Sequence, residues 1–257
     1  GKRLIRTTME LGGKTPVVVC EDADIDAAVA GVLFSAFVAS GQTCVAGSRI
    51  IVHESIYDTF AKKLAQRADQ IQLGDPMDES TQMGPVICRT SLERCKQFIE
   101  TAITEGGQQI SGLEPLQLDD EFAKGFYLRP TIFTDVKIDH TLFLEEVFGP
   151  VISLTRVSND AEAIACANAG DFGLGVSIWS RDIGRAHRLS KSIRGGVIWL
   201  NDHHRNDPRS VWGGVKDSGF GKENGWDALR AYLTKKSIVI RTKEGYDDWF
   251  KDGQRYG

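Results

Sequence analysis

The sequence predicts an α/β fold of layered type. Segments whose apolar residues recur at the helical period alternate along the whole chain with short apolar runs that are typical of strands. This alternation favours a layered α/β architecture over a helical bundle or a β-sandwich. At 257 residues, 41% hydrophobic and 26% charged, the chain is long enough for a substantial core, in one large domain or two small ones.

The first 75 residues predict three strands and two helices. Gly12-Gly13 closes the first apolar run, and Asp22-Ala23-Asp24 is a good start signal for a mostly buried helix that Gly41 ends. The next helix is amphipathic and stops before a Gly74-Asp75-Pro76 turn. The expected strands are 4–11, 17–20 and 48–53, and the expected helices are 25–40 and 55–71.

The rest of the chain keeps the same rhythm. We expect helices at 91–105, 160–169, 183–193 and 223–233, and strands at 108–111, 151–155, 174–180, 196–200 and 236–241. Residues 112–125 are expected to form a surface loop. The polar segment 201–222 holds four glycines, and a loop so rich in turn residues is where function tends to lie.

Composition limits the classes of partner. The net charge of −4 is spread along the chain without a Lys/Arg block, which argues against a nucleic-acid or anionic-membrane partner and favours a small-molecule substrate. No apolar run reaches the length of a membrane span, and the start of the chain does not resemble a signal peptide. Five cysteines without a Cys-x-x-Cys pair argue against disulfides and a zinc knuckle, so we expect reduced thiols and a cytoplasmic protein.

Cys44 and Glu10 are the candidate reactive residues. Small residues surround Cys44 in the segment 41–47, so a substrate can approach and backbone N–H groups stay free to stabilise an oxyanion. Glu10 lies between apolar residues and a tight turn, where burial would raise its pKa toward that of a general base. Taken singly, such a cysteine is more often a small buried hydrophobe, and such a carboxylate is usually solvated.

Four segments together resemble the aldehyde dehydrogenase superfamily. They are Met-Glu-Leu-Gly-Gly-Lys at 9–14, Gly-Gln-Thr-Cys-Val-Ala-Gly-Ser-Arg at 41–49, Glu-Glu-Val-Phe-Gly-Pro at 145–150 and Gly-Gly-Val-Lys-Asp-Ser-Gly-Phe-Gly-Lys-Glu-Asn-Gly at 213–225. They occur in the family's order and span most of the chain. The resemblance implies the layered catalytic domain of this family, with most of the Rossmann-like cofactor domain absent.

The resemblance also implies a mechanism and a cofactor, NAD or NADP. Cys44 would attack an aldehyde to give a thiohemiacetal and then a thioester, and Glu10 would activate the water that hydrolyses it. Glu146 would bind the nicotinamide ribose, with Phe148 near the nicotinamide and Gly12 beside them. Without the other motifs, Glu146 and Phe148 would be read as a helix-capping acid and a core aromatic.

Family enzymes are longer, and the part expected before residue 1 carries most of the dinucleotide fold and an oxyanion-hole asparagine. We therefore expect residues 1–13 to be a remnant of the cofactor-binding domain, 14–222 the catalytic domain, and 223–257 a C-terminal helix, oligomerisation strand and tail. The 257 residues alone are expected to bind cofactor poorly. The strand at 236–241 resembles the one by which family members extend a sheet across subunits, so a homo-oligomer is expected.

The predicted substrate pocket consists of Val38, Thr43, Val45 and Trp212. Residues 201–204 and 212–214 resemble the pocket loop of betaine-aldehyde and amino-aldehyde dehydrogenases, where aromatic rings hold a quaternary ammonium. Val38 stands where those enzymes carry an aromatic side chain, so an apolar or aromatic aldehyde is an equal alternative. Adjacent histidines on a strand point to opposite faces, so His203 and His204 are not expected to bind a metal. A non-catalytic assembly module and a cofactor-independent thiol esterase remain as other functions.

Overall fold

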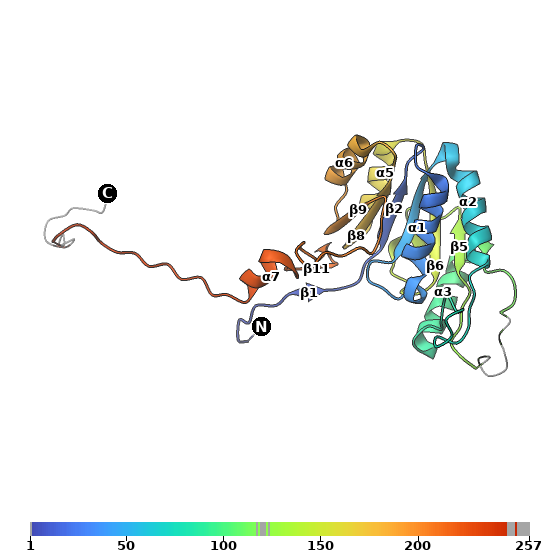
Figure 1. Ribbon diagram of the computed structural model, residues 1–257, viewed down its shortest axis with the longest axis horizontal. Helices are drawn as coiled ribbons and strands as arrows, with labels where there is room; N and C mark the ends of the chain where they lie inside the picture. Colours follow the sequence, from blue (N-terminus) through green and yellow to red (C-terminus); the bar gives the residue numbers. More distant parts are fainter. Residues whose placement is uncertain (1, 117, 119–121, 123, 246–249, 251–257) are drawn as a thin grey trace.

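A computed structural model of the chain describes residues 2–116, 118, 122, 124–245 and 250, and shows a seven-stranded sheet with helices on both faces (Figure 1). The strand order is β4-β5-β6-β3-β2-β8-β9, and β4, at one edge, is the strand that runs antiparallel to its neighbour. The bounds are β2 Thr15–Val19, β3 Gly47–His53, β4 Gln108–Ser111, β5 Thr131–Thr134, β6 Val151–Val157, β8 Gly175–Trp179 and β9 Val197–Leu200. The predicted layered α/β fold is confirmed.

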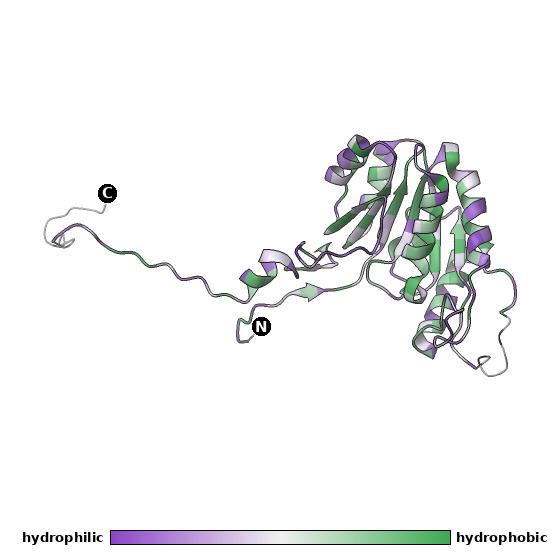
Figure 2. Ribbon diagram, in the orientation of Figure 1, coloured by the Kyte–Doolittle hydropathy of each residue, from purple (hydrophilic) through white to green (hydrophobic). Residues whose placement is uncertain are grey.

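Alternating side chains of the central strands build two cores. In β2, Val17 and Val19 pack under the helices α1 and α2, whereas Val18 faces the opposite core under α5 and α6. A parallel strand covered on both faces has to be apolar at every position, which explains its uninterrupted apolar run. Figure 2 shows hydrophobic residues concentrated on the sheet and on the helix sides that face it.

The long helices follow the sequence expectations within a few residues. They are α1 Ile25–Phe37, α2 Glu54–Asp69, α3 Arg89–Thr104, α5 Asp160–Asn168, α6 Ile183–Ser192 and α7 Gly225–Ala231, with a short α4 at Thr141–Leu144. Asp24 caps α1 through bonds to the Asp26 and Ala27 N–H groups, as its start signal predicted. The expected helix 25–40 ends three residues early, because Val38–Gly41 forms a 3-10 turn whose Ala39 and Ser40 are left-handed.

Two strand predictions need correction, and one buried strand was missed. The strand at 4–11 is reduced to β1, Met9–Glu10, which pairs with β11, Gly219–Phe220. Residues 236–241 are not a strand within this chain, because a strand needs a partner and Ile238, Val239 and Ile240 are 76–91% exposed. The buried strand β5 was not predicted. Most of the tail 245–257 lies outside the described residues.

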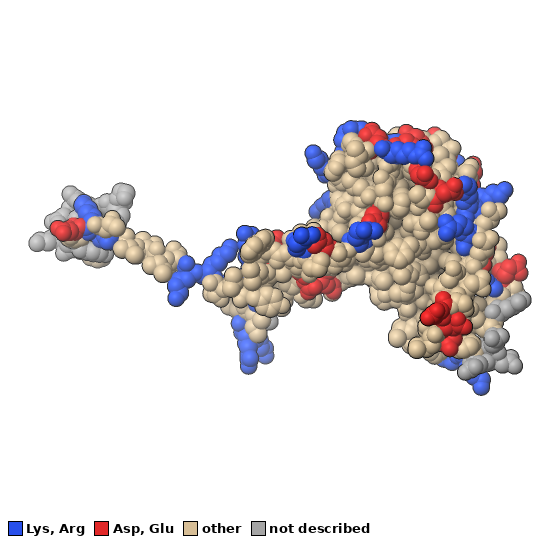
Figure 3. All heavy atoms as spheres, in the orientation of Figure 1, with Lys and Arg blue, Asp and Glu red and all other residues tan. Residues whose placement is uncertain are grey.

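The glycine-rich segment 201–222 is not wholly loop. It contains β10, Val215–Lys216, which pairs with β7, Phe172–Gly173, and it contains β11. The β1–β11 pair and α7 lie beside the main sheet, and the chain beyond α7 leads away from it (Figure 1). Acidic and basic side chains are interspersed on the face shown in Figure 3, without a single basic patch. No helix in the described ranges combines the length and apolar character needed to cross a bilayer.

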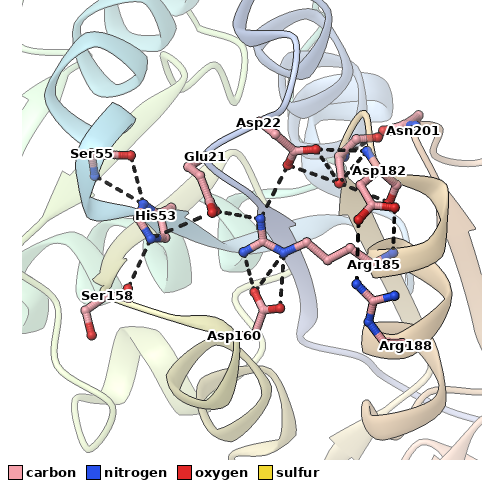
Figure 4. A network of polar contacts seen from close by, with 11 residues as sticks. Glu21, Asp22, His53, Ser55, Ser158, Asp160, Asp182, Arg185, Arg188 and Asn201 are labelled. Atoms are coloured by element: carbon pink, nitrogen blue, oxygen red, sulfur yellow. Dashed lines mark hydrogen bonds and ion pairs between the residues drawn. The ribbon is translucent and has the colours of Figure 1, made fainter.

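The carboxyl edge of the parallel sheet is occupied by an ionic network (Figure 4). Arg185 of α6 pairs with Glu21 at 2.7 Å, with Asp22 at 3.5 Å and, through two nitrogens, with Asp160. These carboxylates follow β2 and β6, so one guanidinium ties together the loops that leave the two strands on either side of β3. Open α/β sheets usually bind ligands at this edge. Here the candidate motifs lie at the opposite, amino edge.

Candidate active site

Four loops meet at the amino edge of the sheet. Gly13 and Lys14 lead into β2, Cys44 leads into β3, Glu146 precedes β6, and Leu174 precedes β8. Because these strands are parallel, their starting ends share one edge. A Cβ on Gly13 would lie 2.2 Å from the Cys44 carbonyl oxygen, which shows how closely the first two loops pack. The structure thus brings the glutamate, cysteine and cofactor motifs together.

Cys44 lies on a tight turn. The Ala46 N–H donates to the Thr43 carbonyl at 3.0 Å, which makes Cys44 and Val45 the two central residues. Three consecutive left-handed residues, Ala39 to Gly41, lead into it. Ala and Ser rarely adopt this conformation, so the surrounding packing has to impose it, as it does where the Ser40 hydroxyl donates to the Gly84 carbonyl at 2.9 Å.

The Cys44 thiol sits in a mixed electrostatic environment. Burial raises its pKa above the ordinary value, and the carboxylates of Glu10 and Glu146 raise it further. The backbone N–H groups of Cys44 and Val45 act in the opposite direction and lower the pKa, because their dipoles favour a negative charge on the sulfur. At neutral pH the sulfur therefore carries its proton, and its activation needs a proton acceptor.

Glu10 is held by the predicted pocket residue Trp212. The indole Nε1–H donates to Glu10 Oε2 at 3.1 Å, while Oε1 is buried and has no hydrogen-bond partner among the described residues. Burial raises the Glu10 pKa, and the negative charge of Glu223 adds to this, whereas the Trp212 bond and Lys222 lower it. The expected burial effect is confirmed, and it suits a carboxylate that accepts a proton.

Glu146 and Gly12 form a small cradle. The Gly13 N–H donates to Glu146 Oε1 at 2.9 Å, and a Cβ on Gly12 would lie 2.3 Å from Oε2. Only a glycine leaves room for the carboxylate in this position. Phe148, two residues on, is left-handed and 44% exposed. Its ring is therefore available to a ligand and is not part of the core.

The remaining predicted pocket residues differ in exposure. Val38 and Thr43 are half-buried, and the Thr43 hydroxyl is buried without a partner in the described part of the chain. Val45 is buried against Leu174 and Trp199. Its side chain therefore packs into the core next to Cys44 and does not line an open substrate pocket.

Matches to known proteins agree with this geometry. A model described as the aldehyde dehydrogenase family matches residues 1–238. The chain belongs to the aldehyde dehydrogenase family. It is 40% identical over 240 residues to a betaine aldehyde dehydrogenase of Brucella anthropi, covering 93% of this chain and 49% of that relative. A betaine aldehyde dehydrogenase of Cereibacter sphaeroides is 41% identical, with 91% and 47% covered.

Solved structures give the same result. A betaine aldehyde dehydrogenase from Staphylococcus aureus, solved in complex with NAD+, superposes with a TM-score of 0.92 at 35% identity, covering 97% of this chain and 49% of that one. An aldehyde dehydrogenase from Bacillus cereus gives a TM-score of 0.86 at 36% identity, covering 92% and 47%. The chain therefore spans about half the length of the aldehyde dehydrogenases it matches.

An aromatic cluster beside the candidate site was not predicted from the sequence, although two of its members lie in the predicted pocket loop 201–204. Trp199, His203 and His204 form an aromatic cluster, in which His203 lies 4.7 Å from Trp199 and 4.6 Å from His204 between ring centroids. The premise that the two histidines point apart was wrong, because they follow β9 in an irregular segment and their rings touch. The described residues contain no group of three or more metal-ligating side chains.

The sequence predicted no role for Lys14 beyond its place in the motif 9–14. It is buried, its Nζ has no hydrogen-bond partner within the described ranges, and burial lowers its pKa to about 7. Arg49 lowers that pKa further, whereas Glu146 and Glu145 raise it. The only signal in the sequence was a lysine directly before a buried strand, a place where a charged side chain is rarely found.

Proposed function

We propose that the protein, at its full length, oxidises an aldehyde to a carboxylic acid with NAD+ or NADP+ through a covalent intermediate on Cys44. One observation carries the proposal. Cys44 lies on a tight turn, the N–H groups of Cys44 and Val45 lower its pKa, and the Glu10 carboxylate is near enough to raise it. A nucleophile, a base and oxyanion donors thus meet at one edge of the sheet.

In the first step Glu10 takes the proton of the Cys44 thiol, directly or through water. The sulfur then attacks the aldehyde carbon, a C–S bond forms, and the carbonyl electrons move to oxygen. The Cys44 N–H, which lies close enough to the sulfur to lower its pKa, is placed to donate to this oxyanion. The product of this step is a thiohemiacetal.

The cradle of Glu146 and Gly12 fits the ribose of a nicotinamide cofactor. The Gly13 N–H fixes one oxygen of Glu146 and leaves the other for ribose hydroxyls, while the exposed Phe148 ring offers a surface to the nicotinamide. When bound, the nicotinamide supplies the acceptor for the hydride that leaves the thiohemiacetal carbon.

The final step is hydrolysis of the thioester. Glu10 first releases the thiol proton to solvent and then accepts a proton from water. The resulting hydroxide adds to the acyl carbon, and the C–S bond breaks to release the acid and the Cys44 thiolate. The raised Glu10 pKa helps this step, because a base whose pKa lies nearer the working pH is the stronger proton acceptor.

For the substrate we propose an aldehyde that carries a quaternary or protonated ammonium group. The relatives are named betaine aldehyde dehydrogenases, and the half-buried Trp212, whose ring centroid lies 6.2 Å from that of the buried Trp199, offers an aromatic ring at the edge of the site. Aromatic faces attract such cations. The half-buried Val38 adds no aromatic face, so an uncharged aromatic aldehyde of similar size is the comparison substrate.

The test compares Cys44→Ala and Glu10→Gln with Cys88→Ser, which changes an exposed thiol outside the four sequence motifs. Loss of aldehyde oxidation in Cys44→Ala, and build-up of an acyl-enzyme visible by mass spectrometry in Glu10→Gln, support the proposal. Protection of Cys44 from a thiol reagent by NAD+ favours the dehydrogenase. Ester hydrolysis by a reactive Cys44 that NAD+ does not protect favours the thiol esterase, and an inert Cys44 favours the assembly module.

Two further expectations stay proposals. One is the division into a cofactor-domain remnant at 1–13, a catalytic domain at 14–222 and a C-terminal segment at 223–257. The other is a cytoplasmic homo-oligomer that pairs residues 236–241 across subunits. The exposed apolar side chains of that segment support the second.

A further inference from the structure

The Cys44 turn is anchored from outside by His203. Within the turn, the Ala46 N–H donates to the Thr43 carbonyl, whereas the Val45 carbonyl has its partner outside the turn. His203 Nε2 lies 2.8 Å from that carbonyl oxygen, although the two residues are 158 positions apart in the sequence. This bond joins the segment after β9 to the loop before β3.

The bond fixes the protonation state of the imidazole. A carbonyl can only accept a hydrogen bond, so Nε2 carries the hydrogen and donates it. Burial lowers the His203 pKa to about 4; the bond to Val45 and the nearby Asp202 raise it and His204 lowers it, but burial dominates. The ring is therefore neutral at physiological pH, with its hydrogen directed at Val45.

The imidazole is also held rigidly. His203 is 3% exposed, and its ring packs against Trp199 on one side and the edge of His204 on another. The chain reaches this place because Asn201 and His204 are left-handed, and because the Ser177 hydroxyl donates to the Asp202 carbonyl at 2.8 Å. The donor thus has one position relative to the turn.

The held turn includes two N–H groups that act on the sulfur. The N–H groups of Cys44 and Val45 lower the pKa of the Cys44 thiol and so oppose the effect of burial. A rotation of the turn would change both effects, since the two groups belong to adjacent peptide units. We propose that His203 is a positioning residue, which holds the Val45 carbonyl and so keeps these N–H groups directed at the Cys44 sulfur.

This role deepens the proposed function and rests on it, because Cys44 is the proposed nucleophile. Its test, however, needs neither cofactor nor aldehyde. The variants are His203→Phe, which keeps a ring against Trp199 and removes the donor, and His203→Gln, whose amide nitrogen can reach the place of Nε2. The rate of iodoacetamide labelling at Cys44 is followed against pH by peptide mass spectrometry. Cys88, an exposed thiol in the same molecule, is the internal reference.

In His203→Phe we expect the Cys44 pKa to rise by about half a unit or more and labelling at pH 7.5 to slow about threefold. His203→Gln should recover most of the rate, and labelling of Cys88 should not change in either variant. Equal rates of Cys44 labelling in the unsubstituted protein and in both variants would overturn this inference but not the proposed function. A Cys44 that is inert in the unsubstituted protein overturns the proposed function as well.

A second measurement decides the matter if His203→Phe folds poorly. Because His203 is a fixed neutral donor, the labelling profile of the unsubstituted protein should show no ionisation between pH 5.5 and 7.5 that involves this residue. A step in that range that disappears in His203→Gln would show a titrating histidine and would overturn the inference.

Discussion

Arg185 should be the largest single ionic contributor to stability. Its guanidinium is 14% exposed and faces three carboxylates, whose own exposure lies between 31% and 44%. Replacing Arg185 with Met leaves these carboxylates repelling one another without a cation. Breaking a buried pair costs about 3–5 kcal/mol. An exposed pair costs about 1 kcal/mol or less. For this intermediate burial we expect about 2–3 kcal/mol.

The assay is urea unfolding at neutral pH, with Arg188→Met as the matched control. Arg188 lies on the same helix, is 72% exposed and pairs with Asp182 at 3.6 Å, so its loss should cost about 0.5 kcal/mol or less. A double-mutant cycle with Asp160→Asn should give a coupling of about 1 kcal/mol or more. Equal losses in Arg185→Met and Arg188→Met would refute the reasoning.

The same network predicts the acid limb of stability. Burial acts to raise the Asp22 pKa, but bonds from the Asp182 N–H and the Ser180 hydroxyl outweigh it, so the pKa lies below its ordinary value. A carboxyl with a lowered folded pKa stabilises the protein above its unfolded pKa of about 3.9, and this is lost as pH falls through the folded pKa. Asp22→Asn should therefore flatten the fall in urea midpoint between pH 5 and pH 3, and an unchanged slope would contradict this.

Two further changes test the site. Trp212→Phe removes a hydrogen bond that lowers the Glu10 pKa, so the acidic limb of the pH–rate profile for hydrolysis of an activated ester should move to higher pH; a shift to lower pH would contradict the assignment. Gly41→Ala places a Cβ 2.5 Å from the Gly149 carbonyl at a φ of +71°, whereas Gly106→Ala at φ +94° meets nothing within 4 Å. Both substitutions cost about 1 kcal/mol because the backbone is left-handed at each position. Urea unfolding should show a larger loss of stability for Gly41→Ala. Equal losses would show that the contact with the Gly149 carbonyl relaxes freely.

The sequence predicted the layers of the fold because the spacing of apolar residues along the chain indicates directly which side chains are buried. It failed where a tertiary contact overrides local preference. Nothing local makes Ala39 and Ser40 left-handed; the bond from Ser40 to the Gly84 carbonyl and the packing of Gly41 against the next motif hold them so. β5, Thr131–Thr134, was missed although its four residues are strand formers, because it is short and follows a proline.

In the site, too, local motifs predicted some features and tertiary contacts determined the others. Cys44, Glu10 and Glu146 were found because short motifs surround them, and the structure brings them together. The bond from Trp212 to Glu10 and that from His203 to Val45 join residues 202 and 158 positions apart, and no local pattern encodes them. The two histidines were considered as part of the pocket loop and as metal ligands, and their neighbours in sequence gave no sign of a bond to Val45.

The two reactive residues differ in how firmly they are held. Cys44 leads into β3, which is paired on both sides by β2 and β6, and His203 anchors its turn from a third direction. Glu10 lies on a two-residue strand whose partner is also two residues long, and its carboxylate is tied to the body through Trp212. Few hydrogen bonds and little buried area make such an arm easier to open locally. In the proposed mechanism, Cys44 is thus the fixed reference of the site, and Glu10 is the part that would move between the thiol and a hydrolytic water.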